Sequence, residues 1–452
     1  MRKNKFLIYL LLTAILLCSL TGCTEAPPQP SETLTQTTTT TVADIPNVDY
    51  AGSVELDMES ATLKQEVSVK LFIDGDTTHF HVPTSVNKAG VLKARYLSIN
   101  TPESTGKIEE YGKKASAFTK EKLSSATSII IESENGSWNA DSTGDRYLVW
   151  VWYKPAGSDT YRNLNVEILQ NGLAIANSAA NSRYGSACTA AIAQAKAQKL
   201  NIYSGQPDPD FYYGGAVELT LRELRTNIET YNGVKVAFSG VVTVNDNNSV
   251  YIESYDPETD MYYGISAYYG YNLNGLGLEI LNVGNEVRIV GSVQYYEAGG
   301  TWQVSDLNYR MMKPDDPNNI QKLSDGHKPA YVLTEPSKLE GDTVEIPVGE
   351  EMVTMDYAKL IMSTSVEMKD LYVYDAYTTK NESSASLGAM TLYCQAGGHR
   401  IAVRTIVLYD ANGQLVTQDR FLGKTIDVKG LVDYFDGDYQ IKVFNINDIT
   451  IH

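Results

Sequence analysis

The chain has 452 residues, which is too long for one ordinary domain and predicts two to four domains. It is 43% hydrophobic and 20% charged, a composition that excludes a wholly disordered chain. The formal net charge of −18 argues against a protein that coats nucleic acid with its whole surface. The charge is uneven, because residues 61–206 hold 16 Lys and Arg against 13 Asp and Glu and the remainder is acidic.

The first 22 residues have the pattern of an export signal. Charged residues at positions 2, 3 and 5 precede an apolar core at 6–17, which is too short to favour a transmembrane span. Leu20-Thr21-Gly22-Cys23 follows and resembles the lipobox of bacterial lipoproteins. We expect residues 1–22 to be removed and Cys23 to carry the lipid that anchors the exported protein to the outer face of the bacterial membrane. The alternative is an ordinary secretory signal with an incidental cysteine.

Residues 23–60 are expected to form a Thr- and Pro-rich tether that lifts the folded part off the membrane. Four cysteines occur in the sequence, of which Cys18 lies in the signal and Cys23 is the lipidation candidate. Cys188 and Cys394 remain, far apart in the chain. We expect no disulfide partner for either and predict that both are small core residues.

Residues 61–206 show strand patterns with helices placed late. Alternating apolar residues predict a strand at 67–72, and a hairpin turn at 74–76 leads to a second strand at 77–82. A third strand is predicted at 93–99, ending before Pro102, which cannot donate to a sheet. The remaining predictions are strands at 127–132 and 147–153 and helices at 107–125, 164–173 and 188–200. The pattern predicts a mainly β, α+β chain that begins with a five-stranded barrel of the OB type.

Six motifs occur in one order within this segment. They are Asp74-Gly75-Asp76-Thr77, residues 95–103, Tyr111-Gly112 with 115–120, Asp145-Arg146-Tyr147-Leu148, residues 171–174, and residues 199–204. In this order they resemble staphylococcal thermonuclease (micrococcal nuclease) and its homologues over about residues 67–205. The resemblance implies an OB-type barrel with helices and an endonuclease that hydrolyses phosphodiester bonds in DNA or RNA with Ca²⁺ as cofactor.

The resemblance also implies the roles of individual residues. Ca²⁺ prefers oxygen ligands, and those implied are Asp76, Asn100 and the backbone carbonyl of Thr101. Glu103 would orient or deprotonate the attacking water. Arg95 and Arg146 would bind the scissile phosphate, because a guanidinium is a planar donor with a permanent charge.

Two positions depart from the family pattern. The family usually has Asp where this chain has Asn100, and the lost charge should weaken Ca²⁺ binding. Residues 175–180 are small and polar where the family commonly has tyrosines that stack on a base. Tyr184 could partly substitute, and Lys113 and Lys114 are further candidates for substrate binding. An alternative therefore stays open, in which a weakened or inactive nuclease-fold protein binds nucleic acid or a surface partner.

Two more units are predicted at 215–314 and 344–452, joined by a polar linker at 315–343. Residues 283–293 match residues 422–432, and both continue through a Tyr-rich turn into a last strand. This duplication predicts two smaller OB-like barrels. Their many tyrosines are either core residues or stacking platforms, and few Lys or Arg accompany them. The two modules could bind nucleic acid or a cell-surface protein.

Overall fold

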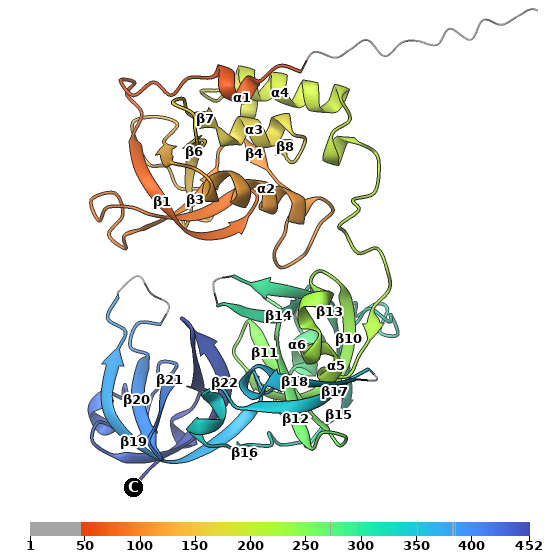
Figure 1. Cartoon of the computed structure of the whole chain (residues 1–452), viewed down its shortest axis with the longest axis vertical. Coiled ribbons are helices and arrows are strands. Elements are labelled where there is room, and N and C mark those ends of the chain that lie inside the picture. The colour runs from red at the N-terminus through yellow and green to blue at the C-terminus, as the bar shows by residue number, and fades with distance from the viewer. Residues whose placement is uncertain (1–46, 272, 298, 350, 382–383, 385) are drawn as a thin grey trace, which may run out of the picture. The chain divides into compact units, whose positions relative to one another are not determined.

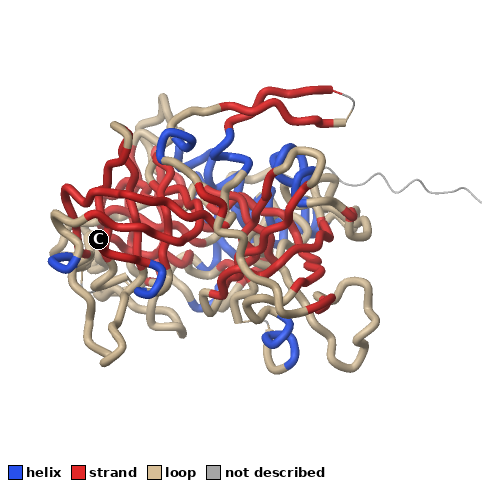
Figure 2. Tube along the Cα trace, turned by 90° about the horizontal axis from the view of Figure 1, so that it is seen from below, coloured by secondary structure: helices blue, strands red, loops and turns tan. Residues whose placement is uncertain are grey.

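The computed structural model describes residues 47–452 apart from positions 272, 298, 350, 382–383 and 385 (Figure 1). The residues expected to form the export signal, Cys23 and the first part of the expected tether lie outside the described residues. Within the described part strands predominate, as Figure 2 shows. None of the helices in that part is long and apolar enough to cross a membrane.

The first barrel closes through the strand order β1–β2–β3–β6–β5–β1. Its strands are β1 (Lys64–Asp74), β2 (Thr77–His81), β3 (Val91–Tyr96), β5 (Ser128–Glu132) and β6 (Tyr147–Lys154). Shorter strands are β4 (Ile99–Asn100), β7 (Arg162–Asn163) and β8 (Ile175–Ala176), and the helices are α1 (Tyr50–Ser53), α2 (Gly112–Ser124), α3 (Leu164–Gln170) and α4 (Gly185–Ala197). Only β3 and β6 pair in parallel among the five barrel strands.

Alternation along these strands fills the barrel with apolar side chains. Phe80, Ile131, Trp150 and Trp152 are all fully buried. Cys188, on α4, belongs to the same core, so its prediction as a core residue is confirmed. Burial raises the pKa of its thiol to about 12, which keeps it protonated.

Two predictions for this region were wrong in detail. The strand expected at 93–99 is split, because Ser98 has a left-handed φ of 67° between β3 and β4. This turn brings the following Asn100 and Thr101 back toward the barrel. The helix expected from residue 107 begins only at Gly112, since Tyr111 also has a left-handed φ, of 63°. The Tyr111 N–H donates to the Asp208 carboxylate at 2.6 Å, a contact across 97 residues that no local pattern reveals.

The second and third barrels repeat the connectivity of the first. The second closes through β10–β11–β12–β14–β13 and the third through β19–β20–β21–β23–β22. In the second region the elements are β9 (Val217–Glu218), α5 (Leu221–Thr226), β10 (Lys235–Asn245), β11 (Ser249–Asp256), β12 (Met261–Tyr268), α6 (Leu276–Ile280), β13 (Glu286–Tyr296), β14 (Thr301–Ser305) and β15 (Gln321–Ser324). In the third they are β16 (Val332–Leu333), β17 (Thr343–Val348), β18 (Glu351–Asp356), α7 (Tyr357–Leu360), β19 (Ser365–Thr378), β20 (Met390–Ala396), β21 (His399–Thr405), β22 (Thr425–Phe435), β23 (Asp438–Val443) and β24 (Ile449–Ile451).

The internal duplication read from the sequence is therefore present in the fold. The matched glycines Gly291 and Gly430 occupy equivalent places in β13 and β22. At Gly291 a side chain would collide with the carbonyl of Ser305 on β14, and at Gly430 with that of Lys442 on β23. The same close approach of fourth and fifth strands excludes a side chain in both barrels.

The segment predicted as a linker contributes to the fold. It contains β15, which pairs with β13, and β16, which pairs with β19. Its residue Ala330 donates its N–H at 2.8 Å to the carboxylate of Glu253, a buried residue of β11. Ser365, at the start of β19, donates to the same carboxylate from its N–H at 2.7 Å and its hydroxyl at 2.9 Å. One buried carboxylate thus joins the second barrel to the first strand of the third.

Candidate active site

Asp76 is the buried centre of the candidate site. It stands in the turn between β1 and β2 and is 0% exposed. One carboxylate oxygen, Oδ2, accepts the N–H of Thr101 at 2.9 Å, and Oδ1 accepts the hydroxyl of Thr77 at 3.0 Å. Arg95 Nη1, from β3, forms an ion pair with the same Oδ1. Three separate segments therefore converge on one carboxylate.

Arg95 extends this group to Asn100. Its Nη2 donates to the Asn100 side-chain oxygen, while its Nη1 contacts Asp76. The Ser98 turn makes this possible, because it places Asn100 on β4, beside the end of β3. The structure thus brings together four of the predicted residues: Asp76, Arg95, Asn100 and Thr101.

Glu103 lies in the loop after β4 and remains exposed to solvent. Partial burial of its carboxyl and the charge of Asp76 raise its pKa, whereas the charges of Arg95 and Arg146 act in the opposite direction. The pKa of Glu103 is therefore nearer to neutral pH than that of an ordinary glutamate. This is the direction that improves a carboxylate as a proton acceptor.

Asp74 is a member of the site that the sequence reasoning did not single out. It is 5% exposed, and its Oδ1 accepts the N–H of Asp76 at 3.1 Å. Burial, followed by the charges of Asp76 and Glu103, raises its pKa to about 7. Its place in Asp74-Gly75-Asp76 was the available indication, because it is two residues from the predicted ligand at the end of the same hairpin.

Arg146 is held by a residue of its own loop. Its Nε and Nη2 both lie 2.7 Å from Oδ2 of Asp141, and its side chain stays 34% exposed. Asp141 was not predicted as part of the site. The fork-like contact fixes the guanidinium while leaving its other donors free to bind an anion.

Two of the three candidate substrate residues have other contacts in the structure. The Tyr184 ring packs edge-on against Trp150 and Trp152, with centroids 5.0 and 5.2 Å away, and its hydroxyl donates to buried Glu132 at 2.9 Å. Lys113 Nζ donates to the carbonyl of Asn232 at 2.8 Å, and burial lowers its pKa. Lys114 is exposed on α2. The contacts of Tyr184 and Lys113 therefore stabilise the fold. The substrate role of all three residues stays a prediction.

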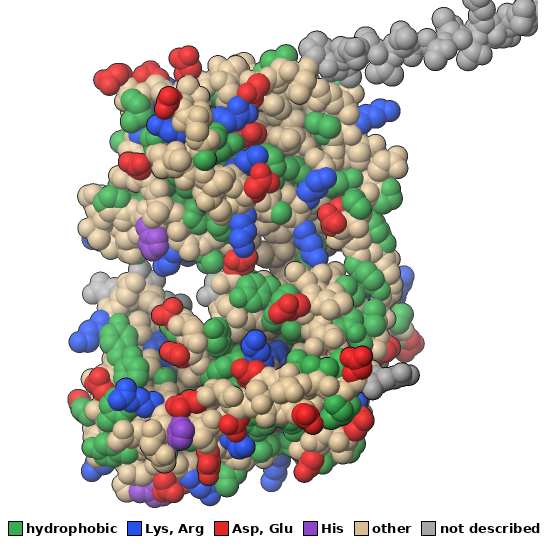
Figure 3. All heavy atoms as spheres, in the orientation of Figure 1, with side chains coloured by type: hydrophobic (Ala, Val, Ile, Leu, Met, Phe, Trp, Pro, Cys, Tyr) green, Lys and Arg blue, Asp and Glu red, His purple; other side chains and the backbone are tan. Residues whose placement is uncertain are grey.

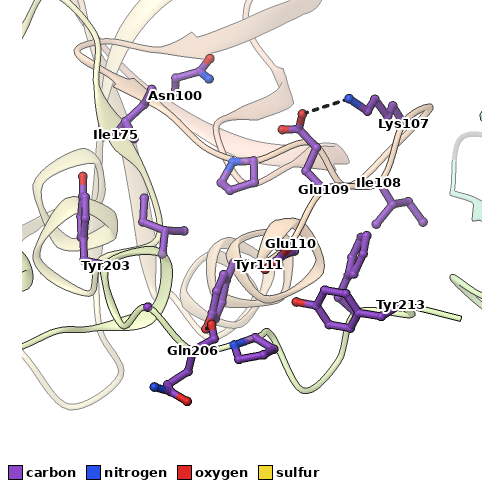
Figure 4. A pocket seen from close by; sticks show the side chains of 15 residues that line it. Asn100, Lys107, Ile108, Glu109, Glu110, Tyr111, Ile175, Tyr203, Gln206 and Tyr213 are labelled. Carbon is purple, nitrogen blue, oxygen red and sulfur yellow. Dashed lines mark hydrogen bonds and ion pairs between the residues drawn. The ribbon is translucent and has the colours of Figure 1, made fainter.

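A cavity of about 810 Å³ adjoins Asn100 (Figure 4). Its wall includes Tyr203 and, from the segment after the first barrel, Tyr213. Lys107 and Glu109 lie on its other side, 3.8 Å apart. The Glu109 carboxylate also accepts the N–H of Glu103 at 3.2 Å, so this cavity is continuous with the loop that carries Glu103.

Comparison with known families agrees with this geometry. Residues 93–205 match the model of the family described as Staphylococcal nuclease homologue. The first barrel is a staphylococcal nuclease-like domain. The match begins within β3 and ends after α4, so it includes Arg95, Asn100, Glu103 and Arg146. Asp76 precedes the matched range and is tied to it by its contacts with Arg95 and Thr101.

The donor set fits a calcium ion in its chemistry. Carboxylate and amide oxygens are the hard ligands that Ca²⁺ prefers, and Asp76, Asn100 and the neighbouring Asp74 supply them. Of the buried carboxylates of Asp74 and Asp76, Asp76 forms an ion pair with Arg95, and Asp74 has no ion-pair partner among the described residues. Two acidic groups that face one monovalent cation suit a site that also takes a divalent cation.

Proposed function

We propose that the first barrel hydrolyses phosphodiester bonds in DNA or RNA with Ca²⁺ as its cofactor. The family match supports a nuclease-fold domain, and the Staphylococcal nuclease family is generally one of nucleases. The observation that carries the proposal is the convergence of Asp76, Arg95, Asn100 and Thr101 beside a cavity. Each of these residues comes from a position that the family pattern assigns to catalysis or metal binding.

In this proposal Asp76, Asn100 and the Thr101 carbonyl hold the calcium ion. When bound, the ion would neutralise the charge that builds up on the phosphate. The protein's own cations act on the same charge. Arg95 has five N–H donors and uses two in its contacts with Asp76 and Asn100, which leaves others for a phosphate oxygen. Arg146, oriented by Asp141, would bind the phosphate from a second loop.

Glu103 is the proposed general base. It is exposed enough to meet water, and its raised pKa strengthens it as a proton acceptor at neutral pH. It would take the proton of the attacking water as the oxygen bonds to phosphorus and the leaving oxygen departs. Glu109 fixes the Glu103 backbone at the mouth of the cavity.

The test is a digestion assay on the purified mature chain with single- and double-stranded DNA and with RNA. Digestion with millimolar Ca²⁺ that stops on chelation supports the proposal, and the Glu103→Gln variant should abolish most of it. Because Glu121 is an exposed glutamate on α2, Glu121→Gln is the matched control. No digestion at millimolar Ca²⁺ would reject the enzymatic proposal.

A second candidate is a nuclease-fold protein with weakened or no catalysis that binds nucleic acid or a surface partner. Asn100 favours it, because its amide lacks the charge of the family's aspartate. Figure 3 adds that basic and acidic side chains are interspersed on the face it shows. Nucleic-acid binding without cleavage, unaffected by Glu103→Gln, would support this candidate.

We also propose that the protein is exported and anchored at the outer face of the bacterial membrane through lipid on Cys23. The export signal and lipobox in the sequence support this location. Replacing Cys23 with Ser should move the protein from the membrane fraction to a soluble fraction. Retention in the membrane fraction would contradict the anchor.

A further inference from the structure

A second cavity lies where the second and third barrels meet. Its volume is about 650 Å³, and its lining comes from α5, from the β13–β14 hairpin, from α7 and from the β22–β23 hairpin. The walls are held by shared packing, because α7 places Leu360 in the core of the second barrel and Ala358 in that of the third. The cavity is thus part of the packed fold.

The polar wall of this cavity is Arg225, a residue of α5 that is only 9% exposed. Its Nη2 donates to the carbonyl of Lys359, and its Nε is buried without a hydrogen-bond partner among the described residues. No carboxylate in the described chain forms an ion pair with it. Burial lowers its pKa to about 10. A guanidinium buried with so few partners is costly unless an anion compensates it.

Charged neighbours of Arg225 in the cavity lining are Glu229, Asp356 and Lys359. The Asp356 carboxylate accepts the Lys359 N–H at 3.0 Å and caps α7. Together these three residues offset the charge of Arg225, so the lining has no formal net charge. Arg225 differs from Glu229 and Lys359 because it is buried and has no ion-pair partner among the described residues, whereas those two are exposed.

The other walls carry aromatic pairs from the duplicated hairpins. Tyr295 of β13 faces Trp302 of β14, with ring centroids 5.1 Å apart. Tyr434 of β22 faces Tyr439 of β23 in the same cross-strand arrangement, at 5.3 Å. All four rings line the cavity. A side chain at Gly300 would contact the Tyr434 ring, so the two hairpins adjoin.

We propose that this cavity binds a nucleotide unit, with its phosphate at Arg225 and its base against the Tyr295–Trp302 pair. An anion alone would leave the four rings unused, and an uncharged ring would leave Arg225 uncompensated. A nucleotide joins a planar base to a phosphate dianion. The phosphate can pair with Arg225 while the base packs against the aromatic rings. The unit can be a free mononucleotide or the end of a single strand, because both present the same chemistry.

Trp302 provides a local readout, since the other three tryptophans, at 138, 150 and 152, belong to the first barrel. The experiment titrates the full mature chain with thymidine 5′-monophosphate, thymidine, inorganic phosphate and a decathymidylate. Ca²⁺ is chelated, and the chain carries Arg95→Ala and Arg146→Ala to remove both proposed phosphate contacts of the first barrel. Binding is followed by tryptophan fluorescence and by calorimetry, so the result does not depend on catalysis.

We expect the monophosphate to bind at least tenfold more tightly than thymidine or phosphate. Arg225→Gln should remove this advantage over thymidine, and Trp302→Ala, at a half-buried position, should weaken both nucleoside ligands at least fivefold by calorimetry. Tyr271→Ala, at a tyrosine that is 90% exposed, is the matched control and should change nothing. Tighter binding of the decathymidylate would identify a strand end as the source, and tighter binding of the monophosphate a free nucleotide.

Three results would overturn the proposal. They are no binding of the monophosphate or decathymidylate, equal affinity for phosphate alone, and binding that survives Trp302→Ala unchanged. The last arm keeps the test decisive even where Arg225→Gln fails to fold. Loss of nuclease activity in the first barrel would leave all of these measurements intact.

Discussion

The substitution Asn100→Asp tests the metal site most directly. It keeps the side chain's shape and adds one negative charge where Asn100 accepts a hydrogen bond from Arg95. A unit charge pair about 4 Å apart is worth roughly 4 kcal/mol at an effective dielectric constant of 20. Arg95 would compete with Ca²⁺ for the new carboxylate, and Asp76 would repel that carboxylate. These two effects offset most of the Coulomb energy gained with Ca²⁺. About 1.4 kcal/mol should remain, which is roughly a tenfold gain in Ca²⁺ affinity.

The assay is calorimetric titration of the chain with Ca²⁺, paired with digestion rates over the same Ca²⁺ range. The variant should bind Ca²⁺ about tenfold more tightly and reach half-maximal rate at about a tenth of the Ca²⁺ concentration. Asn181→Asp, at an exposed position of the same domain, controls for a general effect of added charge. Equal Ca²⁺ affinity in Asn100→Asp and the parent chain would refute the placement of Asn100 at the metal.

Three further predictions follow from the contacts described. Glu103→Gln should lower kcat by about 10²- to 10⁴-fold in digestion assays with no change in thermal stability, as expected for a lost general base. Tyr184→Phe should cost about 1–2 kcal/mol in urea unfolding, because buried Glu132 loses a donor, and should leave KM unchanged. Glu253→Ala should destabilise the second and third barrels by about 3 kcal/mol in urea unfolding, since two backbone N–H groups lose their acceptor.

Each of the three has an outcome that contradicts it. Equal rates for Glu103→Gln and the parent chain would remove Glu103 from the chemistry. A raised KM with unchanged stability in Tyr184→Phe would restore Tyr184 as a substrate residue. Exposed Glu345 on β17 offers a matched control for Glu253, and equal effects of the two alanine substitutions would deny Glu253 its bridging role.

The pH dependence of stability tests Glu253 separately. Burial raises its pKa, so the folded chain holds this proton more tightly than the unfolded chain does. The contribution of Glu253 to stability is therefore full below its unfolded pKa and is lost as pH rises through the higher folded value. Glu253→Gln cannot titrate, and its unfolding free energy should fall less between pH 4 and pH 7 than that of the parent chain. Parallel pH curves would contradict the raised pKa.

Local patterns predicted most of the strands because a two-residue alternation leaves a clear trace in the sequence. The expected strand at 67–72 is part of β1, and those at 127–132 and 147–153 correspond to β5 and β6. The break at Ser98 left no such trace, because serine has no special preference for a left-handed φ. That break matters for function, since it turns Asn100 toward Arg95.

The order of motifs predicted which residues of the candidate site would be close in space, while their roles stay predictions. Asp76, Arg95, Asn100 and Thr101 do meet, as the resemblance implied. The partners that tune them were not visible, because a charge effect depends on distance in the fold. Asp74 and Asp141 are ordinary loop carboxylates in the sequence, yet one faces Asp76 and the other holds Arg146.

The cavity between the second and third barrels was also not predictable from the sequence. The repeated Tyr-rich turns were visible in the sequence, but the acidic composition around them argued against an anion site. Composition averages charge over a surface, whereas a ligand meets only the groups that line its cavity. In this cavity a single buried arginine, Arg225, lies among four aromatic rings. We therefore expect one buried cation to decide what the cavity binds in a chain with a formal net charge of −18, because burial removes the water that would otherwise screen its charge.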